Sequence, residues 1–271
     1  MTTALNPDRP PPEGGPHGTL AKALAGDYDF SVYGTLREAW SLVPGSKMTF
    51  FLAGLAIFGI VMIASAVLSF IIPGARAPHA GFFATLLMQI AVTVVSYPFF
   101  LGMMMLGLRR AVGLPIEVRH AFGYFRLAVP VAISAVLIAV LTALGFLLLL
   151  LPGIYLCVAY VFTLPLIGDK ALDAWAAMET SRRAVTPHWF KVCAVAVLPG
   201  IVLGIAFGIA AGLLAGAGAP SVGGAGFALA GILMLLLALA ASIWLGPLIV
   251  IALGVLYRII FGIEERTLHG G

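Results

Sequence analysis

Charged side chains are scarce in this sequence. Asp, Glu, Lys and Arg make up 10% of the residues and hydrophobic residues make up 62%, whereas about a quarter of the residues in a soluble domain are charged. A soluble chain of 271 residues would need far more charge to cover its surface. The composition therefore excludes a soluble globular protein and predicts a multi-pass membrane protein.

Motifs that carry chemistry are also lacking. The sequence contains no Walker loop, no His-Glu-x-x-His, no Gly-x-Ser-x-Gly and no Cys-x-x-Cys. Its two cysteines, Cys157 and Cys193, are interpreted as small apolar residues within helices. We therefore expect no catalytic, cofactor-binding or metal-binding residues, and a protein that is not an enzyme.

What the sequence has instead is a series of long apolar runs. A membrane-spanning helix needs about 20 residues, and the runs predict an all-α fold of six transmembrane helices paired as three hairpins. Pro152 and Gly153 interrupt the longest run and predict the turn of the second hairpin. The predicted spans form a single domain over residues 26–262, and they lie at about 48–73, 81–108, 127–151, 153–168, 192–216 and 227–257.

Positive charge is distributed very unevenly between the connections. Of the 15 Lys and Arg residues, only Arg76 lies in a connection on one side, and the others share the opposite side with all 11 Asp and Glu residues. Because short basic connections remain in the cytoplasm, we expect both termini to be cytoplasmic. Residues 1–25 and 263–271 are predicted to be a disordered tail and a short tail. The net charge of +4 does not indicate nucleic-acid binding.

Three amphipathic segments, at about 31–43, 115–125 and 169–183, precede the three hairpins and predict helices at the cytoplasmic interface. Each has an aromatic anchor beside basic residues, and the third also ends in an arginine pair. These residues could bind anionic lipid head groups, although a role as topology anchors is the interpretation we prefer. The residues concerned are Trp40, Phe122, Trp175, Arg182 and Arg183.

Two patterns within the spans predict helix geometry. Pro98, Pro165 and Pro247 occupy similar places in the second helix of each hairpin, which indicates three kinks and a threefold repeat. In the fifth span, glycine recurs every four residues, and such small-residue spacing is typical of close helix packing. This glycine ridge could pack within the bundle, pack across a homodimer or line a pore, and its members are Gly200, Gly204, Gly208, Gly212 and Gly216.

One region resembles a known family. Leu151-Pro-Gly-Ile-Tyr-Leu, the stretch Pro165-Leu-Ile-Gly-Asp, and His188-Trp-Phe-Lys191 are similar to the YciC-like bacterial six-helix membrane proteins. That group includes the membrane domain of some glycerophosphodiester phosphodiesterases. The resemblance implies a bacterial inner-membrane location and a supporting role in the envelope. It implies no phosphodiesterase activity, because it includes no catalytic domain.

Three functional hypotheses follow. We prefer a non-enzymatic inner-membrane protein that organises lipids or partner proteins, with the bilayer, anionic head groups, and a homo-oligomer or another membrane protein as its partners. The second is a pore or facilitator for a neutral solute, because no ionisable residue lies well inside a span and neutral polar residues such as Gln89 and Thr93 could line a path. The third is a membrane enzyme at the cytoplasmic face, using residues such as Arg182 and His188.

Overall fold

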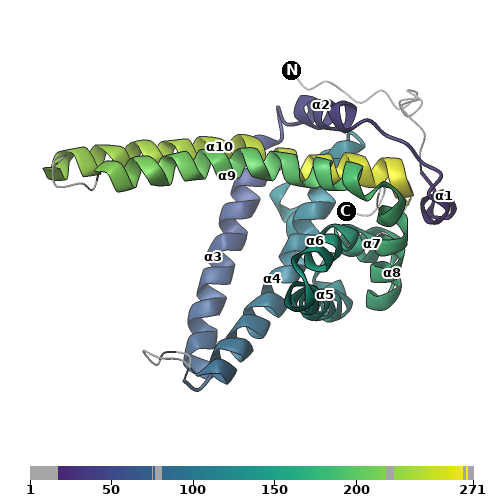
Figure 1. Cartoon of the computed structure of the whole chain (residues 1–271), viewed down its shortest axis with the longest axis horizontal. Coiled ribbons are helices and arrows are strands. Elements are labelled where there is room, and N and C mark those ends of the chain that lie inside the picture. The colour runs from purple at the N-terminus through teal and green to yellow at the C-terminus, as the bar shows by residue number, and fades with distance from the viewer. Residues whose placement is uncertain (1–17, 75, 77–80, 218–222, 265–266, 268–271) are drawn as a thin grey trace.

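The computed structural model describes residues 18–74, 76, 81–217, 223–264 and 267, and within these ranges every regular element is helical (Figure 1). Six candidate helices in this part of the chain are long and apolar enough to cross a membrane. The prediction of an all-α, multi-pass membrane protein is confirmed. Residues 1–17, 265–266 and 268–271, which belong to the two predicted tails, lie outside the described ranges.

Three helical hairpins, here called arms, make up most of the molecule. The helices of each arm pack against each other, and the first and third arms point in different directions (Figure 1). The first arm is α3 (Lys47–Ile71) with α4 (Phe82–Ala111), the second is α5 (Ala128–Leu148) with α6 (Leu150–Ala159), and the third is α9 (Trp189–Ala217) with α10 (Gly223–Phe261). Helical arms suit hydrocarbon surroundings, because a helix pairs its backbone N–H and C=O groups internally.

The arms meet in a packed region that we call the hub. It consists of four short helices together with the last turns of α4 and α10, and its core includes Leu106, Leu166 and Tyr257, all fully buried. The short helices are α1 (Leu20–Ala25), α2 (Val32–Leu42), α7 (Thr163–Lys170) and α8 (Ala174–Val185). Since α1 lies inside the segment predicted to be disordered, that prediction is wrong for residues 20–25.

The predicted interface helices are present in altered form. The first is α2, which begins after Ser31, whose side chain accepts a hydrogen bond from the Gly34 amide. The second is not an α-helix but two short 3₁₀ helices, η1 (Val118–Phe122) and η2 (Phe125–Leu127), on either side of Gly123. The third is α8, which begins only after Asp173, because the Asp173 carboxylate caps its first turn.

The second arm reverses earlier than the sequence predicts. Leu149, in an extended conformation, is the one residue between α5 and α6. Pro152 is the third residue of α6, where its missing N–H would have had no partner within the helix. The turn predicted at Pro152 and Gly153 therefore belongs to the start of the return helix.

The predicted prolines have different structural roles. Pro98 and Pro247 lie inside α4 and α10. Pro165 instead lies in the first turn of α7, after a break at residues 160–162 that divides the fourth predicted span. Pro199, which was not singled out from the sequence, lies inside α9.

Candidate functional site

A buried carboxylate lies at the centre of the hub. Asp169, near the end of α7, is completely buried, and its Oδ2 accepts a hydrogen bond of 3.0 Å from the Tyr257 hydroxyl of α10. Its Oδ1 accepts from the Glu264 amide at 3.2 Å and from the Thr267 hydroxyl at 2.5 Å. A buried charge is tolerated only when it is paired and hydrogen-bonded, so this network ties α7, α10 and the C-terminal segment together.

Basic residues complete this network. The Lys170 ammonium lies 3.5 Å from the Asp169 carboxylate and 3.2 Å from that of Glu264. Arg109, buried at the end of α4, donates to the carbonyl oxygen of Thr267 at 3.5 Å. The chain directly after Asp169 turns through Ala171, a non-glycine residue with a positive φ of 50°, which is a conformation usually stabilised by its surroundings.

Two arginines attach α2 to α4 and α10. Arg110 donates to the carbonyl oxygens of Leu42 and Pro44, at 2.9 and 2.8 Å, and so caps the C-terminal end of α2. Arg258 pairs with Glu38 at 2.7 Å and also donates to the last carbonyl of α4, at Ala111. Arg110 thus places a cation at the negative C-terminal end of α2, and Arg258 places one at that of α4. These contacts, together with the pair between Arg258 and Glu38, hold α2 against α4 and α10.

An aromatic and cationic cluster lies where α2, α3 and α10 meet. The Trp40 and Trp244 rings are stacked with their centroids 5.6 Å apart, and the Lys47 ammonium lies 2.8 Å from the centroid of Trp244. Both indoles remain partly exposed, at 48% and 41%. A half-exposed pair of tryptophans beside a lysine is typical of the boundary between hydrocarbon and water.

The other predicted interface residues do not form one site. Phe122 packs edge-to-face against Phe99 of α4, whereas Trp175 on α8 is 64% exposed. Arg182 and Arg183 both pair with Glu179, at 2.8 and 2.6 Å. Phe122 lies on η1 and the other three residues lie on α8, where both arginines are already paired with Glu179.

The N-terminal segment is attached to the base of α9. The Tyr28 ring lies 4.7 Å from that of His188, and burial raises the pKa of Tyr28 to about 12. Asp29 pairs with Lys191 at 2.6 Å. The hydrogen bond from Lys191, followed by the bond from the Phe30 amide, holds the pKa of Asp29 below its usual value.

The glycines that permit close packing are not those of the predicted ridge. A β-carbon added at Gly200, Gly204, Gly208 or Gly212 would meet no described atom within 4 Å. Packing of these positions within the bundle is therefore not found among the described residues, and a β-carbon at Gly216 lies outside what is described. By contrast, a β-carbon on Gly254 would lie 2.6 Å from the carbonyl oxygen of Gly107, where α4 crosses α10.

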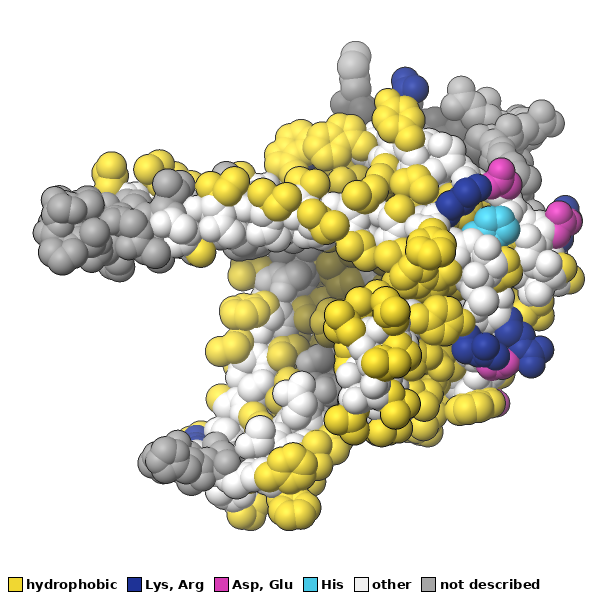
Figure 2. All heavy atoms as spheres, viewed as in Figure 1, with side chains coloured by type: hydrophobic (Ala, Val, Ile, Leu, Met, Phe, Trp, Pro, Cys, Tyr) yellow, Lys and Arg dark blue, Asp and Glu magenta, His cyan; other side chains and the backbone are white. Residues whose placement is uncertain are grey.

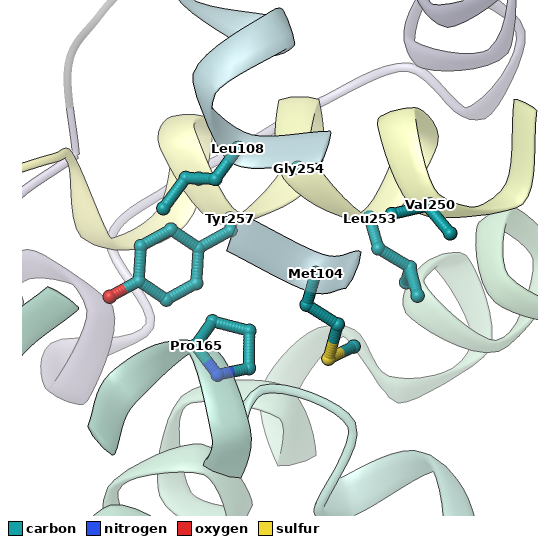
Figure 3. Close-up of a pocket in the computed structure, with 7 residues that line it drawn as sticks. All are labelled: Met104, Leu108, Pro165, Val250, Leu253, Gly254 and Tyr257. Carbon is teal, nitrogen blue, oxygen red and sulfur yellow. The ribbon is translucent and has the colours of Figure 1, made fainter. Parts of the chain in front are cut away.

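A small apolar pocket lies beside this crossing. Its volume is only about 10 Å³, and Figure 3 shows Met104, Pro165 and Leu253 around it. The Tyr257 ring also lines the pocket, but its hydroxyl points away from Met104 and Leu253, which is the side on which it binds Asp169. The side chains lining the pocket are hydrophobic apart from this hydroxyl, so we assign the space to helix packing and not to a substrate.

The arrangement defines a class of protein. A charged hub with three apolar arms makes this chain a multi-pass helical membrane protein. No group of three or more His, Cys, Asp or Glu residues suited to a metal ion occurs in the described ranges. No protein-family model, curated protein or solved structure matches the chain.

Sequence reasoning missed the buried network. Asp169 was assigned to a solvated amphipathic helix, and this interpretation is wrong because Asp169 belongs to α7 and is fully buried. Its partners Tyr257 and Thr267 are 88 and 98 residues away along the chain. The one available signal was a tyrosine near the end of the last apolar run, since a buried tyrosine hydroxyl requires a hydrogen-bonding partner.

Proposed function

We propose that this chain is a non-enzymatic component of a bacterial inner membrane that organises anionic lipids at the cytoplasmic face. The bacterial location follows from the resemblance to the YciC-like proteins. The cytoplasmic position of both termini follows from the positive-inside bias, because the described Lys and Arg residues other than Arg76 lie in or next to the hub.

The observation that carries this proposal is the cluster of Trp40, Lys47 and Trp244. Its indoles fit the head-group region of a bilayer. Lys47 forms none of the described ion pairs, so its ammonium is available to pair with an anionic head group. Nearby, Arg37 is exposed on α2 and adds a second positive charge.

The competing hypotheses receive less support. Thr93, which was suggested for a solute path, donates to the Gln89 carbonyl oxygen of its own helix, and Ser96 one turn later donates to that of Val92. Of the residues suggested for a membrane enzyme, Arg182 forms an ion pair on α8, and the His188 ring lies tilted against that of Tyr28. Neither set surrounds a described pocket.

Lipid enrichment tests the proposal. The purified protein is exchanged into bilayer discs containing phosphatidylcholine and phosphatidylglycerol, and its annular lipids are measured by native mass spectrometry. We expect phosphatidylglycerol to be enriched, and Lys47→Gln to weaken that preference about fivefold, since one basic residue near the surface contributes about 1 kcal/mol. Lys22→Gln, an exposed lysine on α1 without an aromatic partner, is the matched control. Equal recovery of both lipids around the native protein contradicts the proposal.

A further inference from the structure

The turn of the second arm differs chemically from the turns of the other two arms. Five consecutive leucines, residues 147–151, form it, and each is 65–81% exposed. The connection of the first arm contains Arg76 and His79, and that of the third contains Pro220 and Ser221. The first connection is therefore charged and the third has no run of large apolar side chains, whereas the second turn consists of residues suited to hydrocarbon.

The second arm is also the shortest. Its return helix α6 has 10 residues and therefore extends about 15 Å, whereas the 39 residues of α10 extend about 58 Å. After α6 the chain is already inside the hub, because Phe162 and Leu166 are fully buried. The 21 residues of α5 extend about 32 Å, which only matches a hydrocarbon layer about 30 Å thick, so the second arm has no length that would extend beyond that layer.

The turn of the second arm is very tight. Only Leu149 lies outside the helices, and its amide donates to the Gly145 carbonyl oxygen at 3.0 Å. Pro152 in the first turn of α6 has no N–H that would need a partner. Gly145 and Gly153 lie so close that a β-carbon on Gly145 would be 3.0 Å from the Cα of Gly153. The reversal is therefore compact, with the two helices in backbone contact at the turn.

We propose that the leucine turn of the second arm, residues 147–151, remains within the bilayer and contacts lipid acyl chains, whereas the first arm reaches water at Arg76. The second arm is then a membrane-embedded hairpin that enters and returns on the cytoplasmic side. Figure 2 shows mostly hydrophobic side chains over α5 and α6, as this environment requires.

Cysteine accessibility tests this placement in intact cells. In a background with Cys157→Ala and Cys193→Ala, single cysteines replace Leu149, and Pro73 as the matched residue at the first arm's turn. A membrane-impermeant maleimide should label Leu149→Cys at least about tenfold more slowly than Pro73→Cys, because the reactive thiolate does not form in hydrocarbon. Both should react fully after denaturation in detergent. Equal labelling in cells overturns the proposal.

Spin labelling distinguishes contact of the leucine turn with lipid from its burial in a protein interface. With a nitroxide on Leu149→Cys in proteoliposomes, oxygen should relax the label strongly and a water-soluble nickel complex weakly. Weak relaxation by both indicates burial in a protein interface and contradicts the proposal, as does strong relaxation by nickel. Leu151→Cys, at 77% exposure, provides a second position if the first variant does not fold.

Discussion

Gly107 and Gly254 bring the backbones of α4 and α10 into direct contact at the hub. A β-carbon on Gly254 would lie 2.6 Å from the Gly107 carbonyl oxygen, and one on Gly107 would lie 2.5 Å from the Val250 carbonyl oxygen. Neither obstacle is a flexible side chain that could move aside. The first and third arms are therefore joined at a crossing that tolerates no side chain.

Substitution at this crossing should destabilise the protein. Gly254→Ala forces the two backbones apart, and we expect a loss of about 1–3 kcal/mol or more, as for other overpacked interiors. Thermal unfolding in detergent, followed by circular dichroism, measures the change. Gly204→Ala, where a β-carbon meets no described atom, is the control and should unfold like the native protein. Equal effects at the two positions would argue against the crossing.

Removal of the Tyr257 hydroxyl should weaken the hub. Tyr257→Phe deletes the 3.0 Å bond to the Asp169 carboxylate, and a hydrogen bond to a charged group contributes about 1.5–3 kcal/mol. Urea unfolding in mixed micelles provides the measurement. Tyr33→Phe removes a hydroxyl from a 74% exposed side chain and should have no effect. If the two variants prove equally stable, the buried network does not contribute as the geometry indicates.

The attachment of the N-terminal segment should depend on pH. Because the folded-state pKa of Asp29 is lowered, its pair with Lys191 stabilises the attachment above the unfolded pKa, and the effect is lost as the pH falls through the folded value. We expect the amide protection factors of α1, which correct for the intrinsic effect of pH on exchange, to fall in acid more than those of α7. The change is small because Asp29 is exposed and screened. Asp29→Asn should remove the difference, and its persistence in that variant would assign the effect to another group.

The glycine ridge of α9 should affect assembly and not folding. Gly208 is exposed and touches no described neighbour, so Gly208→Leu should leave the melting temperature of the protomer unchanged. If the ridge joins two copies, the variant should shift the oligomer population measured by single-molecule photobleaching in liposomes. The control is Val202→Leu, on the exposed surface of α9. Gly113 is avoided as a control position because its positive φ would make a leucine there strained. Unchanged assembly refutes the packing role.

Reporter fusions should establish the orientation. An alkaline phosphatase fused after Gly224, at the beginning of α10, should be active, and one fused after Gly262, beyond its end, should be inactive. Western blots of both fusions control for expression. The reverse pattern would show that the hub faces away from the cytoplasm.

Much of the fold can be predicted from local patterns. The apolar runs indicate the paired membrane helices because each run alone exceeds the length of a span, and Ser31 and the residues after it indicate α2. Boundaries that depend on neighbouring elements were less accurate. Pro152 suggests a turn when it is read alone, yet the chain reverses at Leu149, where Gly145 and Gly153 allow α5 and α6 to approach.

The sequence by itself determined that this protein resides in a membrane, that its long helices pair, and at which ends of those helices its charged residues lie. These properties follow from the transfer of side chains between water and hydrocarbon, which depends on composition and order along the chain. Only the tertiary structure decided that Asp169 is buried against Tyr257 and that Gly107 and Gly254 form the contact between arms. Contacts between residues distant in sequence depend on how whole helices pack, and no local periodicity records that packing.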